Sequence, residues 1–149
     1  MTNAGFEKVV PSEKKLYGPR KLLLCGFSVE SQPKFKMLLE MLGIADLPLI
    51  WVTENESNAM ISSLFSLSDG SGEGKSSALP RAIVAGGVTQ QELHRLMSGC
   101  RQAGMRQSLW AVLTPTSEQW QLGDLLRELA AEHEAMTQKK GKQPPGTGK

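Results

Sequence analysis

The sequence has little that would place it outside ordinary globular proteins. It contains no apolar run close to the roughly 20 residues of a membrane-spanning helix, and residues 1–15 lack the apolar core of a signal peptide. The formal net charge is only +2, so no strong overall field favours nucleic acid or an anionic membrane. We expect a soluble cytoplasmic protein, or a plastid stromal one if the chain is a mature form.

Cysteine is scarce as well, with only Cys25 and Cys100, both inside apolar segments. A core of this size does not need a disulfide, so the pattern indicates packed thiols in a reducing compartment. A phosphatase-type catalytic loop at Cys25 would want an arginine about six residues further on, where the chain has Ser31. Both cysteines are therefore expected to be buried structural residues.

The body of the chain alternates short apolar runs with amphipathic helical patterns. The runs at 21–25, 47–53, 81–86 and 108–114 are apolar between their end residues, without the alternation of a half-exposed strand. Continuous apolar strands separated by amphipathic helices are typical of a sheet that is covered on both sides. The sequence predicts an α/β fold, with a small, mostly parallel four-stranded sheet and helices on both faces.

The two halves of this pattern are alike, which indicates two tandem β-α-β-α repeats. Aligning the halves places Gly43 on Gly104 and Thr53 on Thr114. If the repeats pack about an axis along the strands, the strand order is 2-1-3-4. We expect a flexible N-terminal arm (1–19), one domain (20–137) and a basic disordered tail (138–149). Within the domain, repeat one (20–68) and repeat two (80–137) are joined by a flexible linker (69–79).

The segment from Thr114 to Leu122 carries the pattern T-P-T-x-x-x-W-x-L, followed by a Leu-rich helix. It resembles an uncharacterised family of small, mostly bacterial and plastid-related α/β proteins, the domain-of-unknown-function family numbered thirty-seven eighty-three. Where members of that family often have Asn, this chain has Ser117. The resemblance implies the same fold and an intracellular location, but the family carries no established activity to transfer.

Three nucleotide or phosphate motifs fail on residue type. Gly74-Lys75-Ser76 would need a glycine at position 69 to complete a P-loop, and the chain has Asp69. The loops after the first and third strands complete no dinucleotide-binding G-x-G-x-x-G pattern. They also lack the acidic residues of a phosphoacceptor receiver domain.

Catalytic and metal-binding clusters are not evident either. His94 and His133 are the only histidines, and neither has the partners that catalysis or metal binding would require. We expect no cofactor and no metal. If this protein is an enzyme, its catalytic groups must come from a partner chain or be of an unusual kind.

Two glycine-containing loops form the candidate ligand site. If the strands share one direction, the loops after strands one and three meet at the topological switch point, where helix N-termini can bind an anion. The residues expected there are Gly26, Phe27, Ser28, Gly86, Gly87 and Thr89. The alternative is that these glycines only serve tight turns.

The first functional interpretation is a non-catalytic interaction or regulatory module that docks on a larger intracellular assembly. Trp120, with Thr114 and Thr116, is the candidate partner-binding segment, although Trp120 could instead close the strand-helix turn by packing. One alternative is a small anionic-ligand or nucleotide sensor that uses the glycine loops. The other is an RNA-associated accessory protein that contacts phosphates through Lys139, Lys140 and Lys142.

Overall fold

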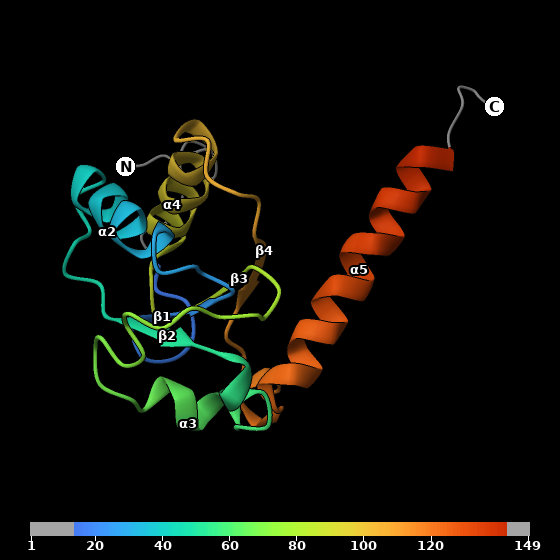
Figure 1. Ribbon diagram of the computed structural model, residues 1–149, viewed down its shortest axis with the longest axis horizontal. Helices are drawn as coiled ribbons and strands as arrows, with labels where there is room; N and C mark the ends of the chain where they lie inside the picture. Colours follow the sequence, from blue (N-terminus) through green and yellow to red (C-terminus); the bar gives the residue numbers. More distant parts are fainter. Residues whose placement is uncertain (1–13, 143–149) are drawn as a thin grey trace, which may run out of the picture.

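A computed structural model describes residues 14–142, with side chains up to Met136. One four-stranded sheet in the order β2-β1-β3-β4 forms the centre of the molecule (Figure 1). This confirms the predicted α/β class and strand order. The strands are β1 (Lys21–Cys25), β2 (Leu49–Val52), β3 (Ala82–Gly86) and β4 (Leu109–Val112); the α-helices are α2 (Ser31–Met41), α3 (Ile61–Phe65), α4 (Gln90–Gln102) and α5 (Leu122–Lys142).

The two halves of the sheet run in opposite directions. β1 pairs with β2 in parallel and β3 pairs with β4 in parallel, but the central pair, β1 and β3, is antiparallel. Its register places Lys21 opposite Gly86 and Cys25 opposite Ala82. The sheet is therefore mixed. The prediction that the two repeats pack about an axis along the strands was wrong, because such an axis would make β1 and β3 parallel. Consequently the carboxyl ends of β1 and β3 lie at opposite ends of the sheet.

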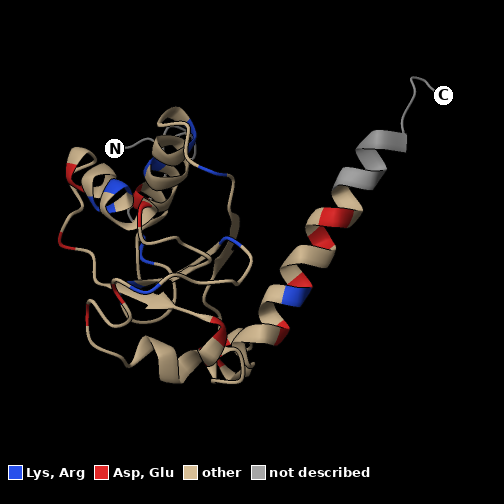
Figure 2. Ribbon diagram, viewed as in Figure 1, with Lys and Arg blue, Asp and Glu red and all other residues tan. Residues whose placement is uncertain are grey.

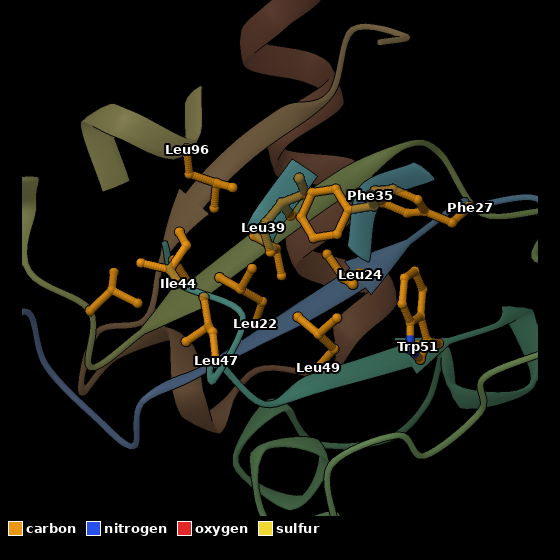
Figure 3. Packing of buried hydrophobic residues seen from close by; sticks show 13 residues of the cluster. Leu22, Leu24, Phe27, Phe35, Leu39, Ile44, Leu47, Leu49, Trp51 and Leu96 are labelled. Atoms are coloured by element: carbon orange, nitrogen blue, oxygen red, sulfur yellow. The ribbon is translucent and has the colours of Figure 1, made fainter. Parts of the chain in front are cut away.

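Each face of the sheet buries its own hydrophobic cluster, because successive strand residues point to opposite faces. Leu22 and Leu24 point toward α2 and α4, where the rings of Phe27, Phe35 and Trp51 pack edge to face (Figure 3). On the other face, Leu23, Cys25, Ile50, Val52 and Val84 pack against α3 and the first turns of α5. Burial on both faces explains why β2, β3 and β1 after Lys21 are apolar, whereas β4 is only partly buried.

The segment from 69 to 79, expected as a flexible linker, lies along the outer edge of β2. The Gly70 N–H donates to the Leu49 carbonyl and the Trp51 N–H donates to the Ser71 carbonyl, each at 2.8 Å. The Leu49 N–H donates to the Asp69 carboxylate at 2.8 Å. An unpaired edge strand is a template for unwanted pairing, and this segment covers that edge within the chain.

The opposite edge of the sheet has no such cover. Among the described residues, β4 pairs only with β3. Beyond its first turns α5 projects away from the body of the molecule (Figure 1), and its residues from Ala130 to Met136 are exposed. No helix in the described part of the chain is long and apolar enough to cross a membrane.

The chain before β1 is also ordered from residue 14 onward. The Leu16 N–H donates to the Val88 carbonyl at 2.8 Å, and the Gly87 N–H donates to the Tyr17 carbonyl at 3.0 Å. Residues 14–18 therefore run along the loop between β3 and α4, whereas residues 1–13 of the expected arm lie outside the described residues.

Candidate functional site

The first predicted loop, Gly26 to Ser28, turns at the carboxyl end of β1. Gly26 has a φ of +76°, and a Cβ there would lie 2.5 Å from the Leu79 carbonyl oxygen. Glycine is therefore required both by the backbone conformation and by the close approach of the chain. The Gly26 N–H donates to the Ser77 hydroxyl at 3.2 Å, so the 69–79 segment is tied to this loop.

A cavity of about 440 Å³ lies beside this loop. We call it the serine pocket, because Ser28 and Ser31 line it from the start of α2 and Ser76 and Ser77 line it from the 69–79 segment. Three cationic side chains also line it: Lys34, Arg81 and Arg106. No Asp or Glu is among the described residues that line it. The serine pocket is therefore polar and strongly positive.

Arg81 is the most buried of the three cations, with only 8% of its surface exposed. Its guanidinium lies over the Phe27 ring, with Cζ 3.7 Å from the ring centroid. Its buried Nε has no hydrogen-bond partner in the described part of the structure. Burial, and secondarily the nearby charge of Arg106, lower the pKa of Arg81. Phe27, which the sequence placed in the candidate ligand site, therefore lies in the core beneath the Arg81 guanidinium.

The second predicted loop, with Gly86, Gly87 and Thr89, lies at the other end of the sheet. The antiparallel register of β1 and β3 separates it from the Gly26 loop, so the expected single site composed of both loops does not form. A Cβ at Gly87 would lie 2.5 Å from the Gly18 carbonyl oxygen. Thr89 caps α4 through a capping box with Glu92.

The predicted partner-binding residues precede α5. The Thr114 hydroxyl accepts from the Ser117 N–H at 2.9 Å, so it stabilises the local turn, and Thr116 is exposed. Trp120 is 36% exposed, while its carbonyl accepts from the Ile61 N–H at 2.9 Å. The Trp120 backbone therefore ties this turn to α3, and about a third of the residue's surface is exposed.

The pairing of β4 with β3 shows which backbone groups of β4 face its outer edge. The N–H groups of Leu109 and Leu113 donate to the β3 side at 2.9 Å and 2.8 Å, to the carbonyls of Arg81 and Ala85. Successive residues of a strand alternate in direction, so the N–H groups of Trp110 and Val112 point to the open side. Val112 is also 37% exposed.

α5 carries predominantly negative charge where it leaves the body. Between Leu122 and Met136 it has four carboxylates and one arginine, and Figure 2 shows the red acidic positions along the projecting part. The arginine, Arg127, forms an ion pair with Asp124. The acidic positions are Asp124, Glu128, Glu132 and Glu134. The predicted tail residues Lys139, Lys140 and Lys142 have side chains outside the described residues.

Other candidate chemistry stays unsupported by the structure. Within residues 14–136, no three His, Cys, Asp or Glu side chains come together as a metal site. Cys25 is buried in the sheet, and burial raises its pKa to about 12. Cys100 is half-buried, and desolvation raises its pKa to about 11. Neither thiol is activated for nucleophilic attack.

Sequence reasoning missed the residues that make the serine pocket positive and polar. Ser76 and Ser77 lie in a segment expected to be a solvated linker, and Arg81 was assigned only as the first residue of a strand. Arg106 comes from the turn between α4 and β4. No local motif joins these residues, because three separate segments supply them.

Comparison with known proteins supports the resemblance noted in the sequence. Searches of curated proteins and of solved structures found no match. Residues 81–136, which run from the start of β3 to Met136 of α5, match the family described as Domain of unknown function (DUF3783), and this confirms the family resemblance carried by the T-P-T-x-x-x-W-x-L segment.

Proposed function

We propose that this chain is a non-catalytic docking module that binds an extended, basic segment of a partner protein along β4. The observation that carries the proposal is the combination of an uncovered strand edge and a helix that projects beside it. In this mode of binding, the partner segment adds a strand to the sheet, and main-chain hydrogen bonds supply much of the affinity.

The open edge provides the groups that such a segment needs. The N–H and C=O groups of Trp110 and Val112 face outward, so a partner strand can continue the ladder without disturbing β3. Val112 and Trp120 add exposed apolar surface near the end of β4. Aromatic residues are enriched among the residues that dominate binding energy at interfaces.

The charge on α5 selects the chemistry of the partner. Glu128 and Glu132 are four residues apart and share one face of α5, so a segment rich in Lys or Arg that passes this face complements them. A second copy of this chain would bring two acidic stretches, residues 122–136, together if the two α5 helices ran in the same direction. Charge along this stretch therefore favours a partner segment that is itself basic.

The proposal is tested with a proline at position 112. Val112→Pro removes an outward N–H and leaves the bonds to β3 intact, because proline is tolerated on the solvent side of an edge strand. Tagged wild-type protein and Val112→Pro are incubated in extract of the source cells and cross-linked. Mass spectrometry then maps the cross-linked sites, and we expect a specific partner on β4 and α5 of the wild type that the variant loses.

The matched control is Met41→Gln, which changes an exposed apolar residue on α2, far from β4. It should keep the partner, and raising the salt concentration should weaken binding because the contacts are electrostatic. Equal recovery of the partner by wild type and Val112→Pro would refute β4 as the docking edge. A homodimer cross-linked through β4 would refute the choice of a different protein as partner.

A further inference from the structure

We infer that the serine pocket binds the phosphate group of a small molecule, because three observations meet there: a buried Arg81 Nε without a hydrogen-bond partner, two serine hydroxyls that can donate, and the further cations Lys34 and Arg106. The serine pocket is separate from the docking edge of β4. Of the two loops predicted from the sequence, it includes only the loop after β1. The inference stands whether or not β4 binds a partner.

Arg81 supplies the strongest part of the argument. A buried charge is costly unless it is paired and hydrogen-bonded. Among the described residues, no carboxylate pairs with Arg81; its neighbours are the Phe27 ring on one side, the like charge of Arg106 and the Cys100 thiol. An anion in the serine pocket would compensate both cations and give the planar guanidinium the acceptor oxygens that it lacks.

The hydroxyl groups of Ser76 and Ser77 can act as donors. The Ser76 oxygen accepts from the Val29 N–H at 3.3 Å, and the Ser77 oxygen accepts from the N–H groups of Gly26 and Leu79, each at 3.2 Å. Because a hydroxyl has one hydrogen and two acceptor lone pairs, accepting these bonds leaves the hydrogen free. Both O–H groups can therefore donate to an oxyanion in the pocket.

The start of α2 adds a favourable dipole. α2 is 11 residues long and has no acidic residue in its first turn. Its first N–H groups are already bonded, from Ser31 to the Ser28 hydroxyl and from Gln32 to the Val29 carbonyl, so this end contributes partial charge and no free donor. Such an end carries partial positive charge. Lys34, one turn into the helix, adds a full positive charge at the same wall. A dianionic phosphate suits this set of donors better than a monoanionic carboxylate, because it offers more acceptor oxygens and more charge.

The size of the pocket points to a small molecule. About 440 Å³ falls within the range of about 300–1,000 Å³ usual for small-ligand sites, and it exceeds the space of one phosphate group. The remaining wall, formed by Ala103, Gly104 and Met105, is apolar enough to contact an organic portion. The ligand class is therefore a phosphate monoester with a compact organic group.

The test is a titration of ¹⁵N-labelled full-length protein, followed by NMR. The probes are phenyl phosphate and inorganic phosphate, with sodium chloride at matched ionic strength as the salt control. We expect the amides of Gly26, Val29 and Gly104 to shift with the phosphates and not with chloride. Arg81→Met should weaken binding of phenyl phosphate about tenfold or more, as expected for the loss of a charge-assisted hydrogen bond.

Two further variants separate binding from folding. Arg106→Gln changes an exposed residue and should weaken binding severalfold without affecting folding, whereas Arg95→Gln, which removes an exposed charge outside the pocket, should bind like wild type. In phosphate-free buffer, Arg81→Met should also raise the urea midpoint, because it removes an uncompensated buried charge. The inference is overturned if neither phosphate shifts these amides, or if Arg81→Met and Arg106→Gln both bind as well as wild type.

Discussion

The two edges of the sheet are finished in different ways. The β2 edge is covered by residues 69–79, whose backbone bonds to Leu49 and Trp51. The β4 edge is left open, with α5 leaving the body beside it (Figure 1). The two halves share the order strand, helix, strand, helix. Similar units can therefore present one closed edge and one edge available for pairing, depending on the segments that follow them.

The cover on β2 is built from specific contacts. Buried Gln32 of α2 clamps it from the other side: its Nε2 donates to the Lys75 carbonyl at 3.0 Å, and its Oε1 accepts from the Gly74 N–H at 2.8 Å. Ser77 and Ser76 then reach the Gly26 loop. The same segment that closes the edge therefore also forms one wall of the serine pocket.

The largest expected effect is at Gly72, where the cover approaches β2 most closely. Its φ is +78°, and a Cβ would collide with the Trp51 carbonyl oxygen, so Gly72→Ala should lower the free energy of unfolding by about 3 kcal/mol or more. Gly74→Ala is the control: φ is +92° but a Cβ there meets open space, so about 1 kcal/mol is expected. Urea denaturation measures both, and equal costs would mean that the cover is not held against β2.

Two proline substitutions on β4 test the open edge through their effect on the free energy of unfolding. Ala111 lies between Leu109 and Leu113, so its N–H faces β3. Ala111→Pro removes that donor and leaves a buried carbonyl unsatisfied, which should cost about 2–3 kcal/mol. Val112→Pro removes an outward N–H and should cost less than about 1 kcal/mol. Thermal or urea unfolding compares the two; an equal loss would show that the outer side of β4 is already paired in the free protein.

The Gln32 hydrogen bonds to residues 69–79 should contribute less to the free energy of unfolding than the close approach of Gly72 to β2. Gln32→Ala breaks two hydrogen bonds from a buried side chain, and we expect a loss of about 2 kcal/mol. Hydrogen exchange should become faster at Gly74. The control is Lys36→Gln, which removes the exposed Lys36–Glu73 ion pair and should cost less than about 0.5 kcal/mol. If both variants cost the same small amount, the cover is held by its backbone alone.

One effect is absent at neutral pH and grows only at high pH, and it comes from Cys25 of β1. Burial raises the pKa of this thiol to about 12, from a usual value of 9.0. In that interval the unfolded thiol loses its proton and the folded one retains it, so stability falls as pH rises. The expected slope is about 1.4 kcal/mol per pH unit.

The Cys25 slope is measured as the difference between wild type and Cys25→Ala in urea midpoints from pH 8.5 upward. Cys25→Ala should lack this component of the pH dependence, and parallel curves would contradict the prediction. Half-buried Cys100, which packs on the α4 side of the sheet, should react with iodoacetamide before Cys25. Reaction of Cys25 first would reverse the comparison, because it would show that the β1–β2 half opens more readily than the half with β4.

The sequence was informative wherever the signal was local. The four apolar runs predicted the four strands. The linker was misjudged because Gly and Ser are typical of solvated loops, and only contact with Trp51 shows why Gly72 is required. The glycine loops were correctly expected to be turns but wrongly expected to lie side by side, because strand direction leaves no mark in an apolar run.

By itself, the sequence determined which segments become strands and helices, because hydrophobic period and capping residues act over a few positions. It also determined that both faces of the sheet are buried. Only the tertiary structure decided that β1 and β3 are antiparallel, since that depends on how two finished units pack. The same packing left β4 open and brought Arg81, Ser76 and Ser77 to one pocket, because these groups meet only once distant segments fold together.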